Sequence, residues 1–189
     1  MLLSLVGERF RARHVGVCLA LAFSHTYADG APRRSPFPQV AKTLRKLSRY
    51  KYGVPSKQAG RGNAPDYIET LCDVTFLCWV DAEHEVNPPP NLEERLDEAL
   101  TRPEAVTRYG VLSLGLSDDA VNDVSLVTDI AGQWHWLVPS DTGPIALPVW
   151  VDHVGSARTR RRRYTMEEQA TTPPCCPPDS HWTAMEAPV

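Results

Sequence analysis

The feature that most constrains the fold is an apolar run between His14 and His25, long enough for one β-strand. One face of the run carries large side chains at every second position, namely Val15, Val17, Leu19, Leu21 and Phe23. The other face carries small residues, namely Gly16, Cys18, Ala20 and Ala22. This period of two predicts a β-strand, and apolar residues on both faces predict a central strand of a sheet covered on both sides.

The same run also fits a secretory signal peptide, and the sequence leaves this alternative open. Arg11 and Arg13 precede the run, and "TYA" at residues 26–28 offers a weak cleavage site. Residues 1–8, "MLLSLVGE", weigh against it, because an apolar stretch and an acid come before the basic residues. That stretch instead predicts the end of a helix that stops at Gly7. Without a leader, we expect a cytoplasmic protein.

Charge is distributed unevenly along the chain. The formal net charge is only −3, but residues 31–65 carry nine Lys or Arg and no acid. Residues 66–129 carry fifteen acids and three bases, and a second basic run holds five Arg between Arg158 and Arg163. One basic segment alone would be interpreted as a solvated loop. Two of them, separated from the acids, predict that one face of the protein meets a polyanion.

The sequence contains no recognisable catalytic or metal-binding set. The five cysteines are odd in number and form no C-x-x-C pair, so we expect reduced thiols rather than disulfides or zinc ligands. The six histidines have no metal-binding spacing; His25 could act as an acid or base, although a structural role is the simpler interpretation. Asp118, Asp119 and Asp123 could hold a divalent cation, but acids at a capped helix start explain them better. We expect no catalytic residue, metal or cofactor.

The remaining pattern predicts a partial βαββαβ order without its first strand. Residues 73–82, Tyr109–Gly115 and 146–154 are predicted strands, and residues 91–102 are a helix capped by Asn91. No stretch is apolar for long enough to span a bilayer, so no membrane partner is expected. The predicted fold class is α+β, with a ferredoxin-like core.

The basic segment at residues 31–65 interrupts this order as an insertion. Val40, Leu44 and Leu47 permit a short basic amphipathic helix, and the Gly- and Pro-rich residues after it predict a loop or irregular hairpin. We expect one domain over residues 1–164. The Pro-rich tail, residues 165–189, is predicted to be disordered.

The insertion has the composition of a segment that binds single-stranded RNA. Its cations alternate with Tyr50 and Tyr52, so that Lys and Arg can neutralise phosphates while the tyrosine rings stack on unpaired bases. The alternative is a solvated loop in which the two tyrosines are packing anchors. The residue pattern does not decide between the two.

Seven segments together resemble the Cas-five family of CRISPR-associated proteins, in its DevS-type branch: "LLSLVGE", "HVGVCLALAF", "LRKLSRYKYG", "GNAPDYIETL", "FLCWVD", "RYGVLSLGLSDDAV" and "LPVWVDHVG". The resemblance runs from Met1 to Tyr164. It implies an RRM-like (ferredoxin-like) core and a non-catalytic subunit of a type I Cascade surveillance complex in antiviral defence. Such a subunit binds the 5′ repeat-derived handle of the guide RNA and contacts the repeated backbone subunit and the large subunit.

The resemblance also assigns a role to the basic insertion. By position, residues 31–65 correspond to a thumb that follows the second core strand and reaches over the RNA. The candidate RNA-binding residues are Arg45, Lys46, Arg49, Tyr50, Lys51, Lys57, Arg61 and Asn63. Family members have a first strand before "LLSLVGE", so we expect an N-terminally truncated chain. The alternatives are an endoribonuclease that processes CRISPR precursor RNA, whose catalytic residues we do not find, and a secreted protein.

Overall fold

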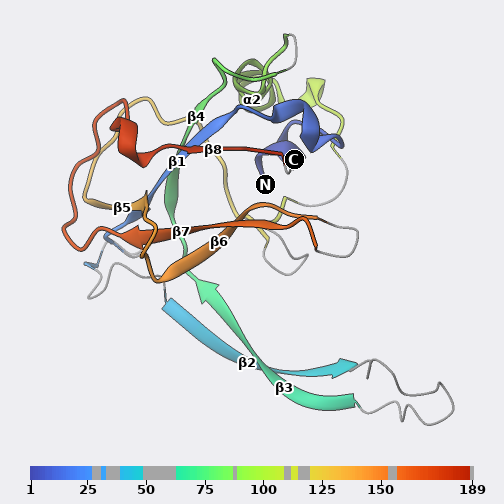
Figure 1. The fold of residues 1–189 in the computed structure, drawn as a ribbon, viewed down its shortest axis with the longest axis vertical. Helices are drawn as coiled ribbons and strands as arrows, with labels where there is room; N and C mark the ends of the chain where they lie inside the picture. The colour runs from blue at the N-terminus through green and yellow to red at the C-terminus, as the bar shows by residue number, and fades with distance from the viewer. Residues whose placement is uncertain are drawn as a thin grey trace, which may run out of the picture.

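The computed structural model describes residues 1–26, 31–32, 39–48, 63–86, 89–108, 112–114, 120–152 and 157–187. Most of the strands within them form one antiparallel sheet in the order β4-β1-β5-β7-β6, and β8 also pairs with β1. Helix α2 lies at one end of this body, and β2 and β3 form a separate hairpin that projects from the other (Figure 1). This mixture of strands and helices confirms the predicted α+β class and is consistent with a ferredoxin-like fold.

The elements follow one another as helices, short 3₁₀ helices (η) and strands. Their bounds are α1 Leu2–Leu5, η1 Arg11–His14, β1 Cys18–Ser24, β2 Gln39–Ser48, β3 Asn63–Cys72, β4 Phe76–Asp81, α2 Leu92–Thr101, η2 Pro103–Ala105, β5 Trp134–Pro139, β6 Ile145–Trp150, β7 Arg160–Met166, η3 Asp179–His181 and β8 Thr183–Ala184. We call β2 with β3 the hairpin, and all the other described elements together the body.

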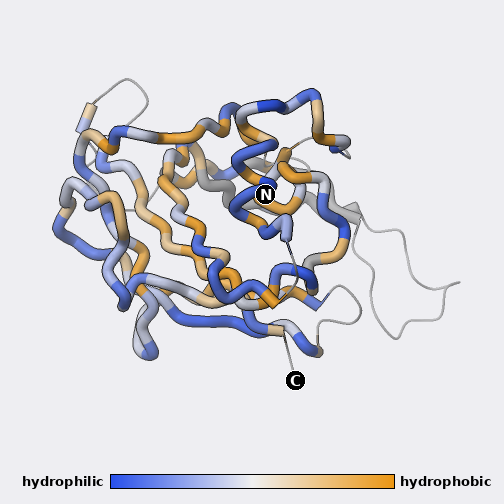
Figure 2. The backbone as a smooth tube through the Cα atoms, turned by 90° about the horizontal axis from the view of Figure 1, so that it is seen from above, coloured by the Kyte–Doolittle hydropathy of each residue, from blue (hydrophilic) through white to orange (hydrophobic). Residues whose placement is uncertain are grey.

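Strand β1 confirms the prediction of a central strand made from the apolar run. It pairs with β4 along one edge, and with β5 and β8 in succession along the other. Its small residues Ala20 and Ala22 are buried, while Leu21 and Phe23 pack from the opposite face. Figure 2 shows hydrophobic segments running through the middle of the molecule, with hydrophilic ones around it. Cleavage of residues 11–28 as a signal peptide would remove this strand, to which three others are hydrogen-bonded.

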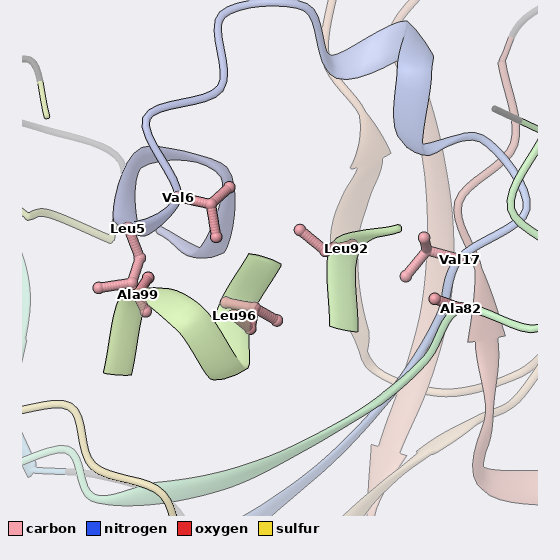
Figure 3. Packing of buried hydrophobic residues seen from close by; sticks show 7 residues of the cluster. All are labelled: Leu5, Val6, Val17, Ala82, Leu92, Leu96 and Ala99. Atoms are coloured by element: carbon pink, nitrogen blue, oxygen red, sulfur yellow. The ribbon is translucent and has the colours of Figure 1, made fainter. Parts of the chain in front are cut away.

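The two helices pack together at one end of the sheet. Asn91 caps α2 in a reciprocal capping box with Glu94, as predicted. The buried face of α2 meets α1 and the start of β1 (Figure 3), through Leu5, Val6, Val17, Ala82, Leu92, Leu96 and Ala99. A four-residue helix cannot persist alone, so this packing holds α1. Gly7 ends α1 with a positive φ, also as predicted.

The C-terminal tail corrects one prediction, because its described residues are ordered against the sheet. Thr171 exchanges backbone hydrogen bonds with Trp134, and the Cys175 carbonyl accepts one from the Trp79 indole. Strand β8 then pairs with β1. The physical reason lies in the sheet, where Trp79 and Trp136 stack with ring centroids 4.7 Å apart. Such a large aromatic surface is unfavourable in water, and the tail covers it.

The hairpin corrects a second prediction, the amphipathic helix at residues 40–49. Residues 39–48 form β2, paired along its whole length with β3. Val40 and Leu44 are four residues apart, a spacing that places them on one face of a helix and equally on one face of a strand. The partner strand decides between these, because the ten cross-strand pairs satisfy the backbone groups on the inner edge of each strand.

Two of the other predicted strands are present. Strand β4 confirms the prediction at residues 73–82, and β6 confirms that at 146–154. The predicted strand Tyr109–Gly115 lies mostly outside the described residues, and its described part forms one isolated bridge, between Ser113 and Ala120. The acids Asp118 and Asp119, which were expected at a capped helix start, also lie outside the described residues.

The part of the chain that the structure describes contains α1, α2 and three short 3₁₀ helices. None of the helices found there is both long enough and apolar enough to cross a bilayer.

Candidate nucleic-acid interface

The hairpin that contains the predicted RNA-binding residues is a two-stranded ribbon. Its ten cross-strand pairs run from Gln39 opposite Cys72 to Ser48 opposite Asn63. It forms a sheet of its own and extends away from the body (Figure 1). An isolated two-stranded ribbon is marginally stable in water. A ribbon of this kind is typical of an arm that binds a partner.

One face of the hairpin exposes apolar and aromatic side chains. Val40, Leu44 and Tyr67 are 51%, 59% and 68% exposed. Leu44 lies directly opposite Tyr67 in the register, so the two residues share a face, and Lys42 is the exposed cation next to Leu44 on that face. An aromatic ring with a cation nearby is the combination that binds a base and its phosphate in single-stranded nucleic acid.

Three of the eight candidate residues lie on the described strands. Arg45 and Lys46 are consecutive residues of β2, and Asn63 is the first residue of β3. In the register, Arg45 pairs with Asp66, Lys46 with Pro65 and Asn63 with Ser48. The other five candidates lie outside the described residues: Arg49, Tyr50, Lys51, Lys57 and Arg61.

Sequence reasoning missed Tyr67. The segment "GNAPDYIETL" was not predicted to be a strand, so Tyr67 was not placed opposite Leu44. The available signal was the strand propensity of Tyr67, Ile68 and Thr70, although Pro65 weakens it. Pro65 is tolerated because a two-stranded ribbon consists of edge strands alone.

His25, the predicted acid or base, pairs with another histidine. Its Nδ1 lies 2.8 Å from Nε2 of His135, whose Nδ1 lies 2.9 Å from the Glu167 carbonyl oxygen. A carbonyl only accepts, so Nδ1 of His135 donates and its Nε2, in the neutral ring, accepts from His25. His135 is buried, with 2% of its surface exposed. This chain of bonds fits the structural role that the sequence favoured for His25.

The cysteines form no disulfide, although the structure describes all five. Burial raises the pKa of the Cys78 thiol to about 12, so the reactive thiolate is scarce at neutral pH. No group of three or more metal-ligating side chains occurs within the described residues.

Comparison with known proteins gives one informative match. No family model matches the chain. A protein of Myxococcus xanthus (strain DK1622), named "CRISPR-associated protein Cas5", is 35% identical to it over 162 residues. The aligned region covers 84% of this chain and 70% of that protein. It therefore includes most of the body and is too long to reflect a shared motif alone.

Proposed function

The chain belongs to the Cas5 family of CRISPR-associated proteins, and from this premise we propose that it is a non-catalytic subunit of a type I Cascade surveillance complex. In this proposal it binds the 5′ repeat-derived handle of the guide RNA during antiviral defence. Its protein partners are the repeated backbone subunit and the large subunit. The DevS-type branch of the family is part of the same proposal.

The observation that carries the proposal is the exposed face of the hairpin. Tyr67 and Leu44 lie opposite each other there, with Lys42 on the same face. An exposed tyrosine can stack on an unpaired base without regard to its identity, and neighbouring cations can neutralise the phosphates. Strand β2 of the hairpin lies within residues 31–65, the segment with nine bases and no acid, and β3 begins there and continues to Cys72.

The proposal assigns no catalytic step to the chain. Cleavage of RNA by acid–base chemistry needs a side chain that can reach the 2′-hydroxyl or the leaving oxygen. His135 is buried, and His25 is bonded to it through Nδ1. These contacts support a structural role for the pair, and the proposed activity is binding alone.

Binding of repeat-derived RNA tests the proposal. We expect the full chain to bind a labelled RNA with the handle sequence, in fluorescence anisotropy, more tightly than a scrambled RNA of equal length. Replacing four cations of the insertion together by Ala should weaken that binding by about 3–4 kcal/mol, if each contact contributes about 1 kcal/mol. The four substitutions are Arg45→Ala, Arg49→Ala, Lys51→Ala and Lys57→Ala.

A control variant on the body makes this result specific. Arg102, on the surface at the end of α2, forms an exposed ion pair with Glu98 of its own helix turn. Arg102→Ala should leave RNA binding unchanged. Equal binding by the quadruple variant and the native chain would disprove the role of the insertion. Cleavage of precursor repeat RNA by the purified chain would replace the proposal with the endoribonuclease alternative.

A further inference from the structure

The second basic run of the sequence lies on β7 and forms an exposed cationic strip. Three successive residues, Arg161, Arg162 and Arg163, are exposed, whereas Tyr164 and Met166 further along the same strand are buried. The three arginines pair with β6, while β5 pairs with β7 only from Tyr164 onward. The strip is therefore the part of β7 that extends past β5.

The protein itself offers these guanidinium groups little counter-charge. Arg163 donates to the Gly143 carbonyl over 3.0 Å, and the preceding Arg160 lies 3.4 Å from the Glu186 carboxylate. The side chains of Arg161 and Arg162 make no hydrogen bond or ion pair with any described residue. Consecutive cations repel one another, so an anionic partner would offset a cost that the isolated chain bears.

Neighbouring β6 leaves the strip accessible. Its residues opposite the three arginines are Ala146, Leu147 and Pro148, all of them exposed and uncharged. None of them can form an ion pair with a guanidinium group. The side chains there are also short or compact, so a bulky polymer backbone can approach β7.

We propose that this strip binds the phosphodiester backbone of single-stranded RNA, at a site separate from the hairpin. Arg161 and Arg163 share one face of β7 about 6.7 Å apart along the strand, a spacing comparable with that of successive phosphates in an extended single strand. A guanidinium group binds phosphate through two parallel hydrogen bonds. Arg162 belongs to the opposite face, where it can meet the strand as it passes the edge.

Regular spacing favours RNA over an acidic protein as the partner. An extended nucleic acid repeats its charge at fixed intervals, as an extended row of arginines does, whereas acidic side chains seldom do. That the RNA is the guide RNA rests on the proposed function. Phosphate binding by β7 does not depend on it.

The test measures binding of a labelled single-stranded RNA of mixed sequence, about 16 nucleotides long, to the full chain at several salt concentrations. The variant combines Arg161→Gln, Arg162→Gln and Arg163→Gln. Each phosphate of a single strand that the protein no longer neutralises reduces the slope of log affinity against log salt by about 0.7, so we expect the slope to fall by about 2. Affinity at low salt should fall about tenfold or more.

Two controls separate charge from geometry and position. Changing the same three residues to Lys should preserve most of the salt dependence while weakening binding, because an ammonium group lacks the paired donors of a guanidinium group. Arg102→Gln on α2 should change neither quantity. Since the three side chains are exposed on the surface of β7, the variants should unfold at nearly the native temperature.

The outcomes distinguish this inference from the proposed function. An unchanged slope in the triple Gln variant overturns the inference, and the proposed function stands if the quadruple insertion variant still loses handle binding. Loss of handle binding in the triple Gln variant but not in the quadruple variant supports the inference and refutes the hairpin as the main site. Unchanged RNA binding with loss of assembly into the complex also overturns the inference, and assigns the strip to an acidic protein surface.

Discussion

The body and the hairpin use apolar residues in opposite ways. In the body, Leu5 and Leu92 are exposed by 2% or less and pack between α1, α2 and the sheet. In the hairpin, Leu44 and Tyr67 are exposed by more than half, although they too lie on paired strands. Both regions have regular secondary structure, so burial, and not order, separates them.

This difference assigns separate roles to the two regions. Burial of apolar surface is the main source of folding free energy, and the body contains it. The apolar surface of the hairpin stabilises the isolated chain little, which leaves it available to a ligand. Substitutions of buried apolar residues in the body should therefore change stability, and substitutions of exposed residues in the hairpin should change binding. The following predictions test that separation, beginning with the largest effect.

The largest predicted effect is the difference in stability loss between Leu92→Ala in the body and Leu44→Ala in the hairpin. Leu92→Ala removes a side chain with no exposed surface and leaves a cavity between α2 and the start of β1, so we expect a loss of about 3–4 kcal/mol in the free energy of unfolding. Leu44→Ala should cost about 0.5 kcal/mol or less. Urea unfolding followed by circular dichroism measures both. Equal losses would show that the hairpin belongs to the folding core.

A buried charge network in the body should give the next largest effect. The Glu8 carboxylate lies 2.6 Å from the Arg95 guanidinium, and His14 sits between Glu8 and Glu85. Burial opposes ionisation of Glu8, but the hydrogen bond from Arg95 and those from the backbone amides of Phe10 and Arg9 outweigh it and lower its pKa to about 2. The network ties the segment after α1 to α2.

Glu8→Gln should cost about 2–3 kcal/mol, because Arg95 loses the charge that compensates it. In the native chain, Glu8 binds a proton more readily when unfolded, with its ordinary pKa of 4.5, than when folded. The contribution of ionised Glu8 to the free energy of unfolding is therefore complete above about pH 4.5, and it is lost as the pH falls toward 2. We expect the free energy of unfolding, followed from pH 6 to pH 2, to fall less steeply with acid in Glu8→Gln than in the native chain. The control variant Glu98→Gln, whose ion pair is exposed, should behave as the native chain does.

The body was also the region that the sequence predicted best, and the reason is local. Helix α2 carries its own start signal in Asn91 and Glu94, and β1 alternates without interruption. The errors fell where distant residues decide the structure. Strand β2 depends on a partner that begins fifteen residues after it ends, and the tail depends on a tryptophan surface built by β4 and β5. Neither dependence is visible in a window of the sequence.

The candidate site was predicted as a region rather than as a surface. Composition drew attention to the basic insertion, because net charge needs no knowledge of geometry. The face was not predictable, since the pairing of Leu44 with Tyr67 follows only once β2 and β3 are known to be strands. Tyr67 was missed for the same reason.

Substitution of Tyr67 should change RNA binding and not stability, whereas substitution of Leu92 should change stability. Tyr67→Ala should weaken binding of handle RNA by about 1–2 kcal/mol, the contribution of one stacked base, and leave the unfolding midpoint almost unchanged. Tyr67→Phe keeps the ring and should bind nearly as the native chain does. Fluorescence anisotropy with the handle RNA measures all three proteins. If the Phe variant binds as weakly as the Ala variant, the hydroxyl and not the ring contacts the RNA.

Substitution of Lys42 should have the smallest effect on RNA binding. The salt dependence of that effect distinguishes a contribution of charge from one of stacking. Lys42→Gln removes one exposed cation from the face of Leu44 and Tyr67, so binding at low salt should weaken by about 1 kcal/mol or less, and the salt slope should fall by about 0.7. Stacking by Tyr67 is not ionic, so the cost of Tyr67→Ala should persist at high salt, where that of Lys42→Gln disappears. Anisotropy titrations at low and high salt compare the two variants. If the Lys42→Gln deficit persists undiminished at high salt, Lys42 acts through packing within the hairpin, and the division between a stabilising body and a binding arm fails at that residue.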